Sequence, residues 1–171
     1  ELLQIADLAR ENPNINILSD EIYELILKKE FKHYSLSSLA NDLKDRIFII
    51  NGFAKGWAMT GWRIGYLVGP KDVIKASSAL QSQSTSNVCS FVQKGALEAL
   101  KINNEFFSMI NSHYDQRRSL LYEGLKNING IYIEEPNGAF YAFPKLPNSS
   151  ITSFDFCNKA LQDYGLVVVP G

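Results

Sequence analysis

The most reactive arrangement of residues in the sequence surrounds Lys55. This lysine follows an apolar run that ends at Ile50, and its neighbours are glycines and aromatic residues, whereas an exposed loop lysine usually has polar neighbours. Partial burial disfavours the ammonium form of a lysine and helps the neutral amine to attack a carbonyl group. Taken alone, a lysine in such a segment more often covers apolar surface with its aliphatic stem. Covalent chemistry at Lys55 therefore needs support from the surrounding residues.

A second polar group follows an earlier apolar run. Asp20 stands at the carboxyl end of that run, and Tyr23 comes three residues later. The pair offers a carboxylate and a phenolic hydroxyl from one short turn. On its own, Asp20 is more often a helix cap or a turn residue. The pair gains weight only from its position before Lys55.

The segment from Gly52 to Gly65 resembles the cofactor-lysine signature of class I aminotransferases, which use pyridoxal 5'-phosphate (PLP). It has a glycine, two residues and Lys55, then seven residues and Arg63, followed by an apolar residue and a glycine. The resemblance implies that Lys55 holds PLP as a Schiff base and later moves a proton between the substrate Cα and the cofactor C4′. It also implies that Arg63 binds the cofactor phosphate, for which a guanidinium has the bidentate geometry.

The same family has an Asp-x-x-Tyr at this distance before its cofactor lysine. The resemblance implies that Asp20 pairs with the ring nitrogen of PLP, so that the protonated ring can absorb the carbanion electrons. It further implies that Tyr23 bonds the ring oxygen and lowers the pKa of the Schiff base. We therefore predict Lys55, Asp20 and Tyr23 as catalytic residues, and these three together with Arg63 as the cofactor-binding set.

The match has one departure and two less specific extensions. The family usually has a serine before the lysine, and its hydroxyl binds the phosphate, but this chain has Ala54. The loss of one such hydrogen bond costs about 1–2 kcal/mol of cofactor binding. Residues 81–87 resemble the loop that approaches the neighbouring subunit's cofactor in these dimers. Residues 136–144 resemble a hairpin of the small domain near the substrate entrance.

Alternating apolar and polar residues, helical periodicity and turn signals predict the elements that must position these groups. The predicted helices cover about residues 1–10, 35–43, 71–80, 90–100, 104–127 and 153–164. The predicted strands cover residues 15–18, 46–50, 64–68, 131–135, 139–143 and 166–169. The first three strands are separated by helices or long excursions, which favours a layered α/β sheet with parallel neighbours.

The change from layered α/β to a hairpin and a helix predicts two domains. We expect residues 1–103 to be the second half of a large PLP-binding domain, and residues 104–171 to be most of a small α+β C-terminal domain. The chain begins inside a helical pattern and stops just after an apolar run, so we also expect it to be a piece of a longer enzyme. The family's glycine-rich phosphate loop would precede it, and the arginine that binds the substrate carboxylate would follow it.

The composition excludes several other classes of function. The net charge is −1 and no basic tract is present, so no nucleic-acid partner is expected. The longest apolar runs are too short to cross a bilayer, and nothing at the start resembles a signal peptide, so no membrane partner and a cytoplasmic location are expected. His33 and His113, and the separate thiols Cys89 and Cys157, show no metal-ligand spacing. No metal site is predicted.

The resemblance thus predicts a homodimeric PLP-dependent transaminase whose substrates are an amino acid, aspartate or similar, and a 2-oxo acid. The closest likeness is to bacterial-type aspartate aminotransferases, through Met59–Arg63 and Ser84–Asn87. One alternative is another PLP enzyme of the same fold, such as a C–S lyase, an aminocyclopropane-carboxylate synthase-like enzyme or a diaminopimelate aminotransferase, because all of them stabilise a carbanion at Cα. The other alternative is that the isolated chain is a catalytically incompetent fragment.

Overall fold

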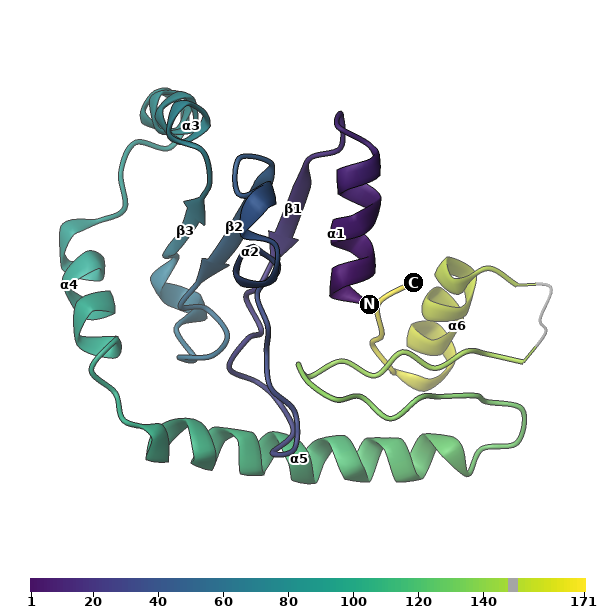
Figure 1. Cartoon of the computed structure of the whole chain (residues 1–171). Coiled ribbons are helices and arrows are strands. Elements are labelled where there is room, and N and C mark those ends of the chain that lie inside the picture. Colours follow the sequence, from purple (N-terminus) through teal and green to yellow (C-terminus); the bar gives the residue numbers. More distant parts are fainter. Residues whose placement is uncertain (148–150) are drawn as a thin grey trace. The chain divides into compact units, whose positions relative to one another are not determined.

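The computed structural model describes residues 1–147 and 151–171, and its elements are shown in Figure 1. The chain forms two compact units, Glu1–His113 and Tyr114–Gly171, which are described separately below. The boundary between them lies inside the long helix α5 (Asn104–Lys126). The assignment of residues 1–103 to a large domain and 104–171 to a small domain remains a prediction.

A three-stranded sheet forms the centre of the first unit, in the order β1 (Ile17–Asp20), β2 (Ile47–Gly52) and β3 (Gly65–Val68). β1 and β2 run parallel, as predicted, but β3 runs antiparallel to β2. The connection between β2 and β3 holds only the short 3-10 helix η2 (Thr60–Trp62), whereas parallel neighbours need a crossover, usually a helix. The expectation of parallel neighbours was therefore wrong for β3, while the α/β class is confirmed.

One side of the sheet is covered by α1 (Leu2–Glu11) together with α2 (Leu36–Leu39) and η1 (Asn41–Leu43). α1 turns small residues inward, so that the helix can approach its neighbours closely. The buried cluster of this layer consists of Ala6, Ala9, Leu36, Ala40, Leu43 and Ile47, with Ile17 and Ile49 packed against it. This core fixes the directions of β1 and β2, whose carboxyl ends carry the predicted site.

Two further helices of the first unit follow the sheet, α3 (Lys71–Ser84) and α4 (Ser90–Ala99). α3 continues to Ser84, so residues 81–84, which we predicted to be a loop, are helical. The serine hydroxyls in this last part bond to helix carbonyls, Ser82 Oγ to that of Ala79 at 2.7 Å and Ser84 Oγ to that of Leu80 at 3.1 Å, so polar residues that suggested a loop are accommodated in the helix. Among the described residues no helix is long and apolar enough to span a membrane.

The second unit holds the rest of α5 and the helix α6 (Ser153–Tyr164). α6 is well delimited, because Thr152 Oγ1 accepts a hydrogen bond from the Asp155 N–H at 3.1 Å and Gly165 ends the helix with φ 66°. Arg118 of α5 is buried and donates Nη2 to the carbonyl of Ala139 at 3.0 Å. This bond joins the helix to the segment that follows Pro136.

The predicted strands of the second unit are not present as strands. Instead of a ladder between residues 131–135 and 139–143, there is an isolated antiparallel bridge between Tyr132 and Lys145. Ala139 has φ 53°, and this left-handed conformation interrupts an extended chain at the start of the second predicted strand. Residues 166–169 also form no strand, and no described strand pairs with them. Their apolar sequence suggested a strand, but a strand needs a partner for its backbone groups.

Candidate functional site

Three of the predicted site residues lie at the end of the sheet where β1 and β2 finish, which is called the sheet edge below. Asp20 ends β1, where it stands opposite Ile50 of β2, and Lys55 follows the end of β2. β3 begins at Gly65, which is paired with Gly52, so Arg63 precedes β3 at the same edge. The carboxyl ends of parallel strands are the usual binding edge of an α/β sheet. The register thus gathers residues that are far apart in the sequence.

The loop that carries Lys55 is anchored to α4. The buried side chains of Phe53 and Met59 form a cluster with Ala96 and Ala99, and Trp57 and Ile64 pack against it. The Trp57 indole Nε1 donates to the carbonyl of Ala99 at 3.1 Å. A Cβ on Gly95 would come within 2.3 Å of the Trp62 ring, so that ring lies directly on the helix backbone. The aromatic residues that surround Lys55 in the sequence are therefore anchors of its loop.

The structure brings Lys55 and Tyr23 together. The Lys55 Nζ atom lies 5.8 Å from the centroid of the Tyr23 ring, which is within the range of a cation–π contact. Both residues are half-buried, so the lysine stem is shielded while its amine remains at the sheet edge. Asp20 is exposed, and its Oδ1 accepts a hydrogen bond from the Ile22 N–H at 3.2 Å. Asp20 therefore starts the turn that places Tyr23 beside Lys55.

Arg63 has an unusual backbone conformation. Its φ is 53° and its ψ is 48°, in the left-handed region, and its Nη1 donates to the carbonyl of Thr60 at 2.8 Å. The side chain is exposed, which leaves guanidinium donors available to an anion at the sheet edge. Ala58, in the same loop, also has a positive φ, of 54°. The loop thus holds two non-glycine residues in a conformation that most residues avoid.

Two glycines allow β2 and β3 to meet closely just beside the site. A Cβ on Gly52 would lie 2.7 Å from Gly65 Cα and 2.8 Å from the Ile64 carbonyl oxygen, and a Cβ on Gly65 would lie 2.9 Å from the Asn51 carbonyl oxygen. These neighbours are backbone atoms, which cannot move aside as a flexible side chain can. The glycines at the two ends of the lysine segment are therefore required by the packing of the strands.

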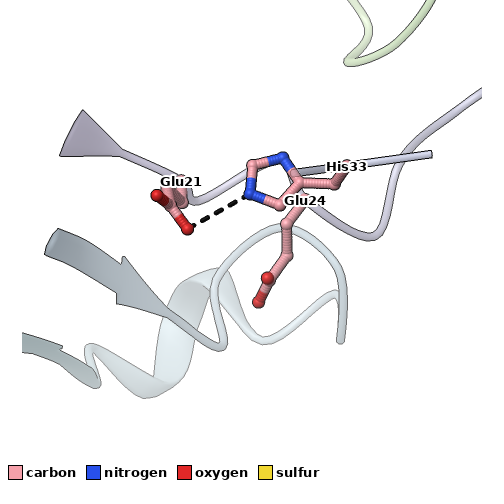
Figure 2. A group of neighbouring side chains, drawn as sticks. All are labelled: Glu21, Glu24 and His33. Carbon is pink, nitrogen blue, oxygen red and sulfur yellow. Dashed lines mark hydrogen bonds and ion pairs between the residues drawn. The ribbon is translucent and has the colours of Figure 1, made fainter. Parts of the chain in front are cut away.

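A buried network of side chains supports the turn that begins at Asp20. Glu21 is only 6% exposed, and its Oε1 accepts hydrogen bonds from Ser19 Oγ at 3.0 Å and from Ser35 Oγ at 2.8 Å. His33 Nε2 lies 3.1 Å from Glu21 Oε2, and Figure 2 shows this pair with Glu24 beside it. A buried carboxylate is stable only when such partners satisfy it.

Glu21, Glu24 and His33 were not among the residues predicted for the site, and His33 was expected to stand apart from other ligand-type residues. Each offers one ligand-type atom, and these atoms lie within 4.8 Å of one another. The contacts of Glu21 with two hydroxyls and an imidazole account for its burial without an ion. The sequence signal for Glu21 is its place in the alternation of Ile17 and Ser19, which turn inward from β1.

The carboxylates of Glu24 and Glu21 also affect the pKa of Tyr66 in β3. Burial raises the pKa of the Tyr66 phenol, and the charges of Glu24 and Glu21 raise it further, because they disfavour a second anion nearby. Tyr66 is paired with Asn51 across the strands, one residue before the lysine segment begins at Gly52. The sheet edge therefore combines the cations Lys55 and Arg63 with carboxylates.

Comparison of the sequence with known proteins identifies one family. The family description "Aminotransferase class I and II" matches residues 1–171. The "Probable aspartate/prephenate aminotransferase" of Rickettsia felis is 40% identical over 181 residues, which cover 100% of this chain and 44% of that protein. The aspartate aminotransferase of Pyrococcus horikoshii is 39% identical, over 98% of this chain and 42% of that protein.

Comparison of the fold with solved structures identifies the same family. The crystal structure of an aromatic aminotransferase from Pyrococcus horikoshii OT3 superposes with a TM-score of 0.89 and 34% identity, over 99% of this chain and 45% of that chain. The chain thus spans less than half the length of the proteins it matches. The class predicted from the lysine segment is confirmed, and the chain belongs to the aminotransferase class I and II family.

Proposed function

We propose that this chain is the lysine-bearing part of a PLP-dependent aminotransferase, which exchanges an amino group between an amino acid and a 2-oxo acid. The observation that carries the proposal is the contact of Lys55 with Tyr23, at the sheet edge that Asp20 and Arg63 share. A half-buried amine beside a phenol, with a carboxylate and a guanidinium at the same edge, is a donor set that matches the polar groups of PLP.

The residues present fit PLP in charge. The exposed carboxylate of Asp20 suits the protonated ring nitrogen, and the exposed guanidinium of Arg63 suits the phosphate dianion. Gly52 and Gly65 let β2 and β3 approach closely, and this close approach brings Lys55 and Arg63 to the same edge. Ala54 supplies no hydroxyl, so the phosphate depends more strongly on Arg63 than it does in relatives with a serine there.

When bound, PLP supplies an electron sink for the bond-breaking step at the substrate Cα. The residues of the chain supply orientation and proton transfer around it. Lys55 would hold the cofactor covalently and, once released, would move a proton at the substrate Cα. Asp20 would keep the ring nitrogen protonated, Tyr23 would donate its hydroxyl to the ring oxygen, and Arg63 would bind the phosphate.

The proposal extends to the substrates and to the assembly. We take aspartate or a similar amino acid as the donor, supported by relatives named as aspartate aminotransferases, and a 2-oxo acid as the acceptor. A homodimer in the cytoplasm is part of the same proposal, because the family resemblance implies it. The segment after α3 would then approach the cofactor of the second subunit.

Product analysis of the purified protein in its full natural length tests the reaction type. With aspartate and 2-oxoglutarate we expect equal amounts of the new oxo acid and the new amino acid, because the amino group is transferred. Ammonia formed without an acceptor would instead identify a lyase and contradict the proposal. The 171-residue chain alone should show little or no turnover, since the substrate carboxylate arginine and the phosphate loop of the family have no counterpart in it.

Replacement of Tyr23 by phenylalanine should change the pH response of the bound cofactor. In the proposed site the phenol would donate to the ring oxygen and so favour the unprotonated form of the cofactor–lysine link. Without it, the change in visible absorption should move to higher pH by roughly 1–2 units, since a hydrogen bond to a charged group contributes about 1.5–3 kcal/mol. A spectrophotometric pH titration of the PLP-loaded protein measures this shift.

The matched control is Tyr34→Phe. Lys32 Nζ lies 5.5 Å from the centroid of the Tyr34 ring, so the two residues form a similar lysine–tyrosine pair outside the predicted cofactor-binding set. The control should leave the titration unchanged. A Tyr23→Phe curve that coincides with that of the unmodified protein would show that Tyr23 does not touch the ring oxygen.

A further inference from the structure

A buried side chain, that of Asn51, joins the loop that holds Lys55 to the turn that holds Tyr23. Asn51 is only 4% exposed. Its Nδ2 donates to Glu24 Oε1 at 2.7 Å, and its Oδ1 accepts from the Gly52 N–H at 2.7 Å. One amide thus connects the carboxylate of the turn to the backbone of the loop, at the point where the loop leaves β2.

A packing contact joins the same two segments on the other side of Lys55. A Cβ on Gly56 would come within 2.8 Å of both Leu25 Cβ and Leu25 Cδ1, so the backbone of the loop lies directly against that side chain. The turn residues Glu24 and Leu25 therefore contact the loop before and after Lys55. The lysine–tyrosine contact of 5.8 Å lies between these two connections.

Hydrogen bonds hold the turn in place, so contacts with the turn can fix the position of the loop. The Glu21 N–H donates to the carbonyl of Ile50 at 2.8 Å, which continues the pairing of β1 and β2 into the turn. The Glu21 carboxylate is fixed by Ser19, Ser35 and His33, as Figure 2 shows in part. Because the turn is fixed at Glu21, the hydrogen bond of Glu24 with Asn51 can fix the position of the lysine loop relative to the turn.

We propose that Glu24 and Asn51 are positioning residues, whose hydrogen bond sets the separation between the Lys55 amine and the Tyr23 ring. The proposal rests on the proposed function, because that separation matters only if both residues face the same cofactor. Neither residue contacts the reacting atoms. The hydrogen bond needs an acceptor oxygen at position 24 but no charge there, and this distinction makes the proposal testable.

The experiment compares Glu24→Ala, which removes the acceptor, with Glu24→Gln, which keeps an acceptor oxygen. In the full-length protein without cofactor, amide hydrogen exchange of residues 51–59 should be roughly 5- to 30-fold faster in Glu24→Ala. Glu24→Gln should remain within about twofold of the unmodified protein. After addition of PLP and borohydride, labelling of Lys55 should be slower in Glu24→Ala and restored in Glu24→Gln.

Leu43→Ala is the control for a general loss of stability. Leu43 is 5% exposed in the core beside α1, and its truncation should lower stability through a core cluster that contains no residue of the lysine loop. The proposal is overturned if Glu24→Ala exchanges like the unmodified protein, if Glu24→Gln is as fast as Glu24→Ala, or if Leu43→Ala gives the same local acceleration. If the unmodified protein does not attach PLP to Lys55, the proposed function fails, whereas hydrogen exchange still decides the role of Glu24.

Discussion

Lys55→Ala should abolish specific attachment of PLP and, in the full-length protein, lower transaminase activity by at least about a hundredfold. The replacement removes both the covalent link and the group that moves the proton at Cα, and acid–base catalysis by one positioned group is worth about 10²- to 10⁴-fold. The measurement is borohydride reduction in the presence of PLP, followed by peptide mapping. In the unmodified protein the phosphopyridoxyl group should be found on Lys55, and in the variant no lysine should take its place.

Lys32→Ala is the matched control for this experiment. Lys32 also lies over a tyrosine ring, that of Tyr34, but it is not among the residues predicted for the site. Its loss should change neither the labelling of Lys55 nor the activity. Label scattered over surface lysines, with the same pattern in Lys55→Ala, would mean that the chain forms no cofactor site by itself.

Asp20→Asn should give the second large effect, a fall in turnover of about 10²- to 10³-fold with little loss of cofactor. An asparagine keeps the Oδ1 acceptor that the Ile22 N–H uses at 3.2 Å, so the turn is preserved while the negative charge is lost. Without the carboxylate, the ring nitrogen is no longer held in its protonated form. Steady-state kinetics together with the PLP content of the purified full-length protein separates these effects.

Asp45→Asn serves as the control, since Asp45 is exposed and lies before β2, away from the sheet edge. Its turnover should match that of the unmodified protein. An Asp20→Asn enzyme that retains turnover within a few fold would show that another group pairs with the ring nitrogen. A large loss of bound PLP would instead assign Asp20 to cofactor binding rather than to stabilisation of the carbanion.

The helices and the central strands could be predicted because local sequence determines them. Residues Leu2–Glu11 and Ser153–Tyr164 have helical periodicity and clear ends, and the apolar runs before Asp20 and Asn51 are bounded by polar residues. The family resemblance then connected Lys55 with Tyr23, which the structure brings into contact. The roles of Asp20 and Arg63 remain predictions, supported by their common edge.

Other features could not be predicted, since they depend on partners distant in sequence. The direction of β3 depends on how the loop after β2 returns over α4, and the isolated bridge of Tyr132 with Lys145 depends on the left-handed Ala139. The network around Glu21 needs Ser35 and His33, which lie beyond a turn. The inward position of Glu21 could be read from the alternation of the strand, but its hydrogen-bond partners could not be predicted from the sequence.

The left-handed conformation of Arg63 bears on how this protein could be engineered. A side chain in that conformation costs roughly 1–2 kcal/mol relative to the ordinary helical region, and glycine avoids most of this cost. A search for thermostable variants would therefore favour glycine at residues 58 and 63, where φ is 54° and 53°. At Ala58 such a change removes only a methyl group, but at Arg63 it removes the guanidinium. On the proposed role of Arg63, thermostabilisation should leave residue 63 untouched, because glycine there would add stability at the expense of phosphate binding.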